Sequence, residues 1–165
     1  MSFLDYAPAP ESRSIVSLDE HYGLFIGGEF RPGQGTSFPT ISPSTEEVLT
    51  TVSEASSEDV DRAVTAARTA FDKTWSRMPG SERAKYLFRI ARIIQERSRE
   101  LAVAETLDNG KPIKETRDVD IPLVAAWFFY YAGWADKLEH ATGSARPAPW
   151  GVVGQVIPWN FPLMM

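Results

Sequence analysis

Asn160 combines a reactive side chain with an unusual setting, because it lies between Pro158 and Pro162 directly after the apolar run "GVVGQVI". A residue before proline is biased towards extended backbone, so the two prolines favour a stiff bend rather than a helix. The asparagine amide has two N–H donors and no charge. At a dry strand end such fixed donors could stabilise an oxyanion, because they need not reorganise as charge develops. The same residues also suit a rigid turn without chemistry, and taken alone they leave both interpretations open.

The element that must position this bend is an apolar strand. Residues 152–157 show no alternation, since Gln155 alone is polar and Gly154 has no side chain. A strand that is apolar on both faces is typical of a parallel sheet covered by helices. In open α/β sheets, ligands bind beyond the carboxyl ends of the strands, where the predicted bend lies.

The sequence before this strand predicts two β-hairpins and then helices. The run "GLFIGGEF" at 23–30 alternates around Gly27-Gly28, a dipeptide suited to a hairpin turn. Two β-favouring runs on either side of residues 43–45 predict a second hairpin. Beyond residue 53 the apolar period changes from two to nearly four residues, which indicates helices. This order of elements predicts an α/β chain whose sheet is incomplete.

Local signals mark the ends of three helical stretches. Ser56 and Asp59 resemble a capping box, with aspartate in place of the usual glutamate. Ser81 is the predicted N-cap of the second helix, and Asn109 or Gly110 supplies its left-handed C-terminal residue. The third stretch covers about 113–140 and should bend or restart near Pro122, before a loop at 141–150.

The composition is that of an ordinary soluble globular chain. Of the 165 residues, 43% are hydrophobic and 24% charged, and the net charge of −5 argues against binding to nucleic acid or an anionic membrane. The longest uncharged run, at 121–135, is shorter than the ~18 residues of a membrane span. The absence of cysteine excludes a disulfide framework, a zinc–thiolate site and a cysteine nucleophile within these residues. The first residues show no secretory signal, and we expect a cytoplasmic location and a flexible arm at 1–20.

Several segments together resemble the NAD(P)-dependent aldehyde dehydrogenase superfamily, in the family's order and at about its spacing. The resemblance runs from about residue 23 to the end. The segments are "FIGGEF", "TISPSTEEV", "EDVDRAVTAARTAF", "ETLDNGKP", "YYAGWADK" and "GVVGQVIPWNFPLMM".

The resemblance implies a fold and a reaction. Residues 21–165 would be the N-terminal part of a Rossmann-type cofactor domain, with β-hairpins, three helices and the first buried parallel strand. Asn160 would donate its amide to the oxygen of the adduct between a cysteine thiolate and the aldehyde, before hydride passes to NAD, with NADP not excluded. Val156, Ile157, Pro158 and Trp159 would line the ribose and nicotinamide side of the cofactor.

The resemblance also implies a weaker site for a monovalent cation at Thr40, Ile41 and Asp108. For Asp108 and Asn109 a helix stop is the simpler interpretation. The tryptophans and tyrosines of "AAWFFYYAGWADK" are expected to belong to the core.

Two departures from the family limit what these residues can do. The chain has no cysteine, so we expect an N-terminal fragment of a longer enzyme that does not oxidise aldehydes alone. In addition, the region 138–150 is short and rich in proline, which cannot sustain central strand pairing. It predicts a shortened oligomerisation arm and a homodimer rather than a tetramer. The alternative function is a non-catalytic truncated module that binds a full-length relative.

Overall fold

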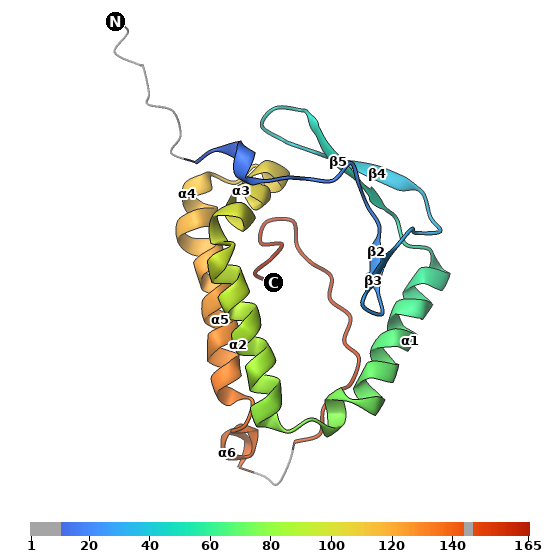
Figure 1. Cartoon of the computed structure of the whole chain (residues 1–165), viewed down its shortest axis with the longest axis vertical. Coiled ribbons are helices and arrows are strands. Elements are labelled where there is room, and N and C mark those ends of the chain that lie inside the picture. The colour runs from blue at the N-terminus through green and yellow to red at the C-terminus, as the bar shows by residue number, and fades with distance from the viewer. Residues whose placement is uncertain (1–10, 144–146) are drawn as a thin grey trace, which may run out of the picture.

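The computed structural model describes residues 11–143 and 147–165. Two small β-sheets come first in the chain and helices follow. In Figure 1, helices α2 and α5 run side by side, α1 and the strands lie opposite them, and the C-terminal segment passes between the two groups. The predicted loop residues 144–146 lie outside the described residues.

The first predicted hairpin is confirmed. Strands β2 (Leu24–Ile26) and β3 (Glu29–Arg31) pair antiparallel across Gly27-Gly28. The two glycines have φ values of 67° and 90°, a left-handed geometry that glycine adopts at little steric cost.

The second predicted hairpin is also confirmed. Strand β4 (Ser37–Ile41) pairs antiparallel with β5 (Val48–Ser53), and β1 (His21–Tyr22) adds to β5 in parallel, which gives the order β1-β5-β4. The turn between β4 and β5 is closed by the Ser42 amide, which donates to the Glu47 carbonyl at 2.9 Å. A parallel strand pair together with helices confirms the mixed α/β class.

Helix α1 (Ser57–Lys73) begins with the predicted capping box. The Ser56 hydroxyl accepts from the Asp59 amide at 3.2 Å, and the Asp59 carboxylate accepts from the Ser56 amide at 3.0 Å. The fully buried Asp59 also accepts from the Gln34 amide at 2.9 Å. These backbone donors and the Arg62 guanidinium hold the pKa of Asp59 far below its usual range. Asp59 therefore ties the connection between β3 and β4 to the start of α1.

The second predicted helix is split and starts earlier than expected. A 3₁₀ turn, η2 (Trp75–Arg77), leads into α2 (Gly80–Glu96), and α3 (Ser98–Asn109) follows after Arg97. The prediction of Ser81 as N-cap is wrong, because the cap is Pro79, whose carbonyl accepts from the amides of residues 82 and 83. Gly80 suits this start because an ideal Cβ there would lie 2.3 Å from the Ala135 carbonyl oxygen. The predicted C-terminal glycine is confirmed, with Gly110 left-handed at φ 74°.

The third helical stretch restarts near Pro122, as predicted. It consists of α4 (Ile113–Glu115), the π-helical turn η3 (Thr116–Asp120), α5 (Ile121–Trp134) and α6 (Leu138–Thr142). Pro122 lies in the first turn of α5, where a missing N–H costs little. No helix within the described residues is long and apolar enough to cross a membrane.

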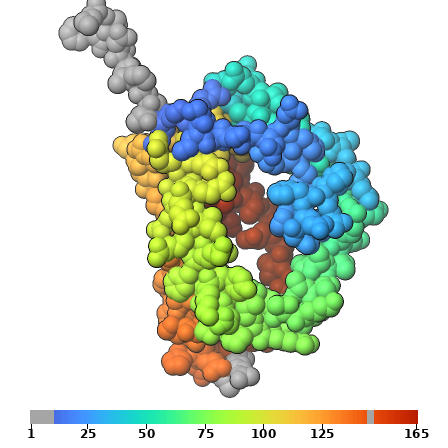
Figure 2. All heavy atoms as spheres, in the orientation of Figure 1, coloured from blue at the N-terminus to red at the C-terminus, as the bar shows by residue number. Residues whose placement is uncertain are grey.

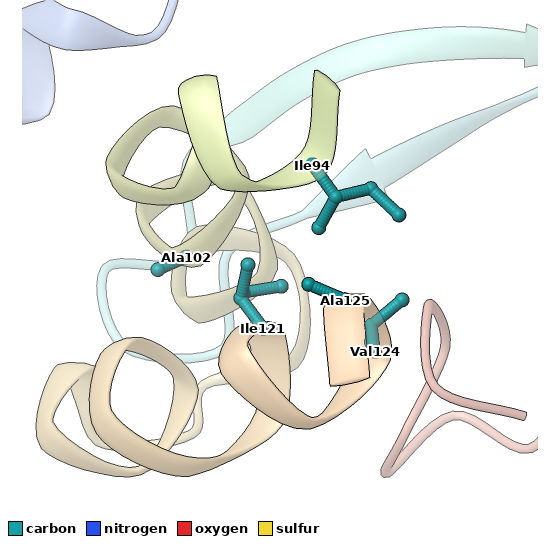
Figure 3. Packing of buried hydrophobic residues seen from close by; sticks show 5 residues of the cluster. All are labelled: Ile94, Ala102, Ile121, Val124 and Ala125. Carbon is teal, nitrogen blue, oxygen red and sulfur yellow. The ribbon is translucent and has the colours of Figure 1, made fainter. Parts of the chain in front are cut away.

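The hydrophobic core lies where α2, α3 and α5 meet (Figure 3). Its buried members are small or branched, which lets the three helices approach closely: Ile94, Ala102, Ile121, Val124 and Ala125. The prediction that the tryptophans and tyrosines of α5 are core is wrong, because all four are exposed. Trp127, Tyr130 and Tyr131 are each about half exposed, because α5 packs on α2 and α3 with only one side.

The predicted buried strand at 152–157 is wrong. The backbone there belongs to neither of the described sheets, and Val156 is 100% exposed. A strand needs a neighbouring ladder of N–H and C=O groups, and none of the described strands pairs with this segment. Figure 2 shows the segment inside an opening between the two groups of elements.

Residues 11–20 of the predicted arm contact the rest of the chain, and residues 1–10 lie outside the described part. Glu11 accepts from Arg99 on α3 at 2.8 Å, and the Thr50 hydroxyl donates to the Asp19 carbonyl at 2.7 Å. A short 3₁₀ turn, η1 (Arg13–Ile15), lies between these contacts.

Candidate functional site

Asn160 lies midway along a closed loop, here called the terminal loop, which comprises residues 155–165. The Gln155 side chain donates to the Met165 carbonyl at 3.2 Å and joins the two ends of the loop. Inside the loop, the Met165 amide donates to the Phe161 carbonyl at 3.1 Å. The Asn160 residue is exposed. The bend expected from the two flanking prolines is therefore present.

The predicted cofactor-lining residues directly precede Asn160 in the chain. Val156 and Trp159 are exposed by 100% and 81%, and Ile157 is about half exposed. Pro158 is half-buried. The structure thus brings these residues to the same loop as Asn160 and leaves their apolar surface open to a ligand.

The terminal loop is anchored on the helices through Phe161. The ammonium of Lys111 lies 3.6 Å from the centre of the Phe161 ring, a favourable cation–π arrangement. Lys111 also forms an ion pair with Asp120, whose side chain is 2% exposed. Its backbone amide donates to the Asn109 side-chain oxygen at 2.8 Å. Contacts with the helical part of the chain therefore restrict Lys111, whose ammonium also contacts the terminal loop.

A buried polar cluster surrounds this ion pair. Glu105, on α3, is 7% exposed, and its Oε1 has no hydrogen-bond partner among the described residues. Burial, together with the neighbouring Asp120 carboxylate, raises the pKa of Glu105 to about 7, against the opposing effect of Lys111. Nearby, the hydroxyls of Thr106 and Thr116 lie 2.8 Å apart. The connection from α3 to α5 is thus held by polar contacts as well as by the apolar core.

The residues of this cluster were missed by sequence reasoning, although the sequence carries a weak signal. Glu105 follows the core residue Leu101 by four positions, and Asp120 precedes the buried Val124 by four. Each acidic residue therefore lies in register with an apolar helix face. Charges at such positions indicate a paired, buried role rather than a solvated one.

An apolar groove adjoins the end of the terminal loop. It has a volume of about 470 Å³ and is formed by α5 together with the last two residues of the loop. Its lining is almost entirely apolar: Leu123, Trp127, Phe128, Tyr131, Met164 and Met165. Met164 also packs against the helical core, so the floor of the groove is continuous with the fold.

The residues of the predicted cation site lie on two segments that meet. Gly110, two residues after Asp108, contacts Pro43, two residues after Ile41. Asp108 and Ile41 are exposed, whereas Thr40 is half-buried. The helix stop itself is made by Asn109 and Gly110, because Gly110 takes the left-handed position. Asp108 is therefore not required for that stop.

Known proteins match almost the whole chain. The model of the "Aldehyde dehydrogenase family" matches residues 30–165. The mitochondrial aldehyde dehydrogenase family 2 member B4 of Arabidopsis thaliana is 46% identical over 155 residues, which are 88% of this chain and 29% of that protein. The chain thus spans less than a third of that relative's length.

Solved structures agree with this match. A mutant aldehyde dehydrogenase from Bacillus cereus superposes with a TM-score of 0.79 at 42% identity, over 88% of this chain and 32% of the other. An NAD⁺ complex of aldehyde dehydrogenase from the same organism gives a TM-score of 0.70 at 45% identity, over 72% and 25%. Sequence, fold and family match therefore agree that this chain belongs to the aldehyde dehydrogenase family, of which it represents the N-terminal portion.

Proposed function

We propose that this chain supplies the cofactor-side segment and the oxyanion-binding asparagine of an enzyme that oxidises an aldehyde to a carboxylic acid with NAD or NADP. The observation that supports the proposal is that Asn160 is exposed midway along a closed loop, in a chain of this family. NAD is favoured over NADP because a relative in the family forms an NAD⁺ complex.

The role of Asn160 is to hold negative charge. Its two N–H donors can bind the aldehyde oxygen as that oxygen becomes an oxyanion, and the flanking prolines limit the motion that would weaken this contact. The attacking thiolate must come from outside these residues, because the 165 residues contain no cysteine. When bound, the nicotinamide would accept hydride from the adduct. Val156, Ile157, Pro158 and Trp159 would hold and orient that ring by apolar contact.

The substrate is proposed to carry an apolar group. The groove beside the terminal loop is lined by apolar and aromatic side chains, with Met164 and Met165 in its wall. An aldehyde whose carbonyl oxygen reaches Asn160 could place a hydrocarbon or aromatic portion there, where burial of apolar surface is favourable.

Two further features remain part of the proposal. Thr40, Ile41 and Asp108 are proposed to bind a monovalent cation weakly, through backbone oxygens and one carboxylate. The complete enzyme is proposed to be a homodimer. This is supported by the region 138–150, which forms the short helix α6 and no strand within its described residues.

A non-catalytic module that binds a full-length relative is the second candidate function. It is favoured by the large apolar surface that the chain exposes on α5 and on residues 152–159. Such a module would bind the relative without restoring any turnover.

A chimera separates the two functions. Residues 23–165 would replace the matching part of the Bacillus cereus enzyme, and NADH formation would be compared among the chimera, that enzyme and the chain alone. We expect NADH from the chimera and none from the chain alone. A folded chimera that binds NAD⁺ but forms no NADH would contradict the proposed function. Turnover by the chain alone would contradict the requirement for an outside thiol.

A further inference from the structure

The terminal loop has one aromatic anchor, and it is the residue next to Asn160. Phe161 is half-buried, and its ring lies under the Lys111 ammonium at 3.6 Å from the ring centre. An ammonium at this distance is attracted by the negative face of the ring, more strongly where water is partly excluded. Asn160 and Trp159, by contrast, are exposed.

Lys111 is itself held from two sides. Its side chain is 18% exposed and pairs with Asp120, which belongs to η3. Its backbone amide is bonded to Asn109 at 2.8 Å, directly after the left-handed turn at Gly110. A flexible lysine stem normally loses much rotamer entropy when it makes a contact. Here the ion pair with Asp120 already restricts the Lys111 side chain, so the contact with Phe161 costs less additional rotamer entropy.

We propose that Lys111, fixed by Asp120, is a positioning residue that seats Phe161 and thereby fixes the bend that carries Asn160. The Phe161 carbonyl accepts a hydrogen bond from the Met165 amide. Holding the Phe161 ring in place therefore restrains the turn that follows it as well as the bend that precedes it. Met164 extends the same anchor into the helical core. The meaning of this device for catalysis rests on the proposed function, but the position of the bend can be tested without any turnover.

Cleavage by chymotrypsin at the Trp159–Asn160 bond measures how often the bend detaches. The complete 165-residue chain is used, and peptides are quantified by mass spectrometry. When detachment and reattachment are fast, the cleavage rate follows the population of the detached state. Cleavage at the α5 aromatic residues in the same samples reports general loss of structure.

Loss of the anchor should raise cleavage at this bond alone. Lys111→Met and Phe161→Leu should each accelerate it by about 5- to 30-fold, without faster cleavage in α5. The double variant should be no faster than the faster single variant, because both substitutions remove the same contact. Lys111→Arg should stay within about twofold of the native chain, since arginine can also pair with Asp120 and lie over the ring. Lys114→Met, an exposed lysine on α4, is the matched control and should change nothing.

Other results would overturn the proposal. Unchanged cleavage at Trp159 in the Phe161→Leu variant would contradict the role of Lys111. This variant keeps the Lys111–Asp120 ion pair, so the test remains possible if Lys111→Met fails to fold. Equal acceleration at Trp159 and in α5 would show a general structural role instead. Failure of the chimera to form NADH would leave this cleavage result unaffected, so the two proposals can fail separately.

Discussion

Glu105 shows how one buried carboxyl can make stability depend on pH. Burial raises its pKa from 4.5 to about 7, so between these values the folded chain keeps a proton that the unfolded chain has released. The free energy of unfolding should therefore fall as the pH rises from about 4.5 to about 7, and should change no further from this cause above that range. The net charge of −5 would not by itself predict this slope.

Glu105→Gln tests this prediction, because glutamine keeps the neutral shape at every pH. We expect the variant to match the native chain near pH 4 and to exceed its urea midpoint at pH 8. Glu100→Gln, on the same helix, is the matched control. The Arg97 guanidinium lowers the pKa of Glu100, so the Glu100→Gln variant should instead be less stable than the native chain at pH 8. A pH-independent difference between native chain and Glu105→Gln would show that Glu105 ionises normally.

At the scale of residues, the sequence identified Asn160 as a candidate site residue, but it did not predict the contact that anchors the loop around Asn160. Two prolines around a polar residue form a local signal that needs no knowledge of the fold. The contact between Lys111 and Phe161 joins residues 50 positions apart, and only the packed helices bring them together. Local patterns do not contain such information.

At the scale of elements, Gly110 joins the end of α3 to the hairpin of β4 and β5. It is left-handed at φ 74°, and an ideal Cβ would lie 2.6 Å from the Pro43 ring. Gly143 ends α6 with φ 62°, and no atom of another described residue lies within 4 Å of an ideal Cβ there, its chain neighbours apart. The two glycines thus share a backbone requirement, but only Gly110 also requires close contact.

Gly110→Ala should therefore be more destabilising than Gly143→Ala. We expect Gly143→Ala to lower the free energy of unfolding by about 1–2 kcal/mol through the left-handed backbone alone. Gly110→Ala should lower it by about 2–5 kcal/mol, because the new methyl group must also displace Pro43. Urea unfolding measures both values. Equal losses would show that the contact with Pro43 is unimportant.

Elements with a local cause were predicted well. The Gly27-Gly28 turn, the Ser56 capping box and the glycine after α3 are each set by residues close in sequence. The break between α2 and α3 at Arg97 has no glycine or proline beside it, so the sequence gives no local signal for it. The strand predicted at 152–157 failed for a different reason, because its pairing partners must come from elsewhere in a sheet.

At the scale of the whole molecule, the chain encloses an opening that its own elements do not fill (Figure 2). The terminal loop passes through it, and apolar side chains on α5 and along residues 152–159 face solvent. Exposed apolar surface of this extent is typical of an interface. In the matching Bacillus cereus structure the aligned part is 32% of the whole chain.

We expect the isolated chain to bind the dye ANS strongly and to self-associate as its concentration rises. The chimera with the Bacillus cereus enzyme should bind much less dye per chain, because the same surface would be covered. ANS fluorescence and light scattering measure the two properties. A monomeric chain that binds no more dye than the chimera would contradict this expectation.

The most direct test of the proposed oxyanion role is the turnover of the chimera carrying Asn160→Ala. Removal of one such donor should lower kcat by about 10²- to 10³-fold, while NAD⁺ binding stays near its original strength. Gln34→Ala, which removes an exposed amide side chain far along the sequence, is the control and should leave kcat unchanged. A kcat within twofold of the unsubstituted chimera would show that Asn160 does not stabilise the charge that develops during the reaction.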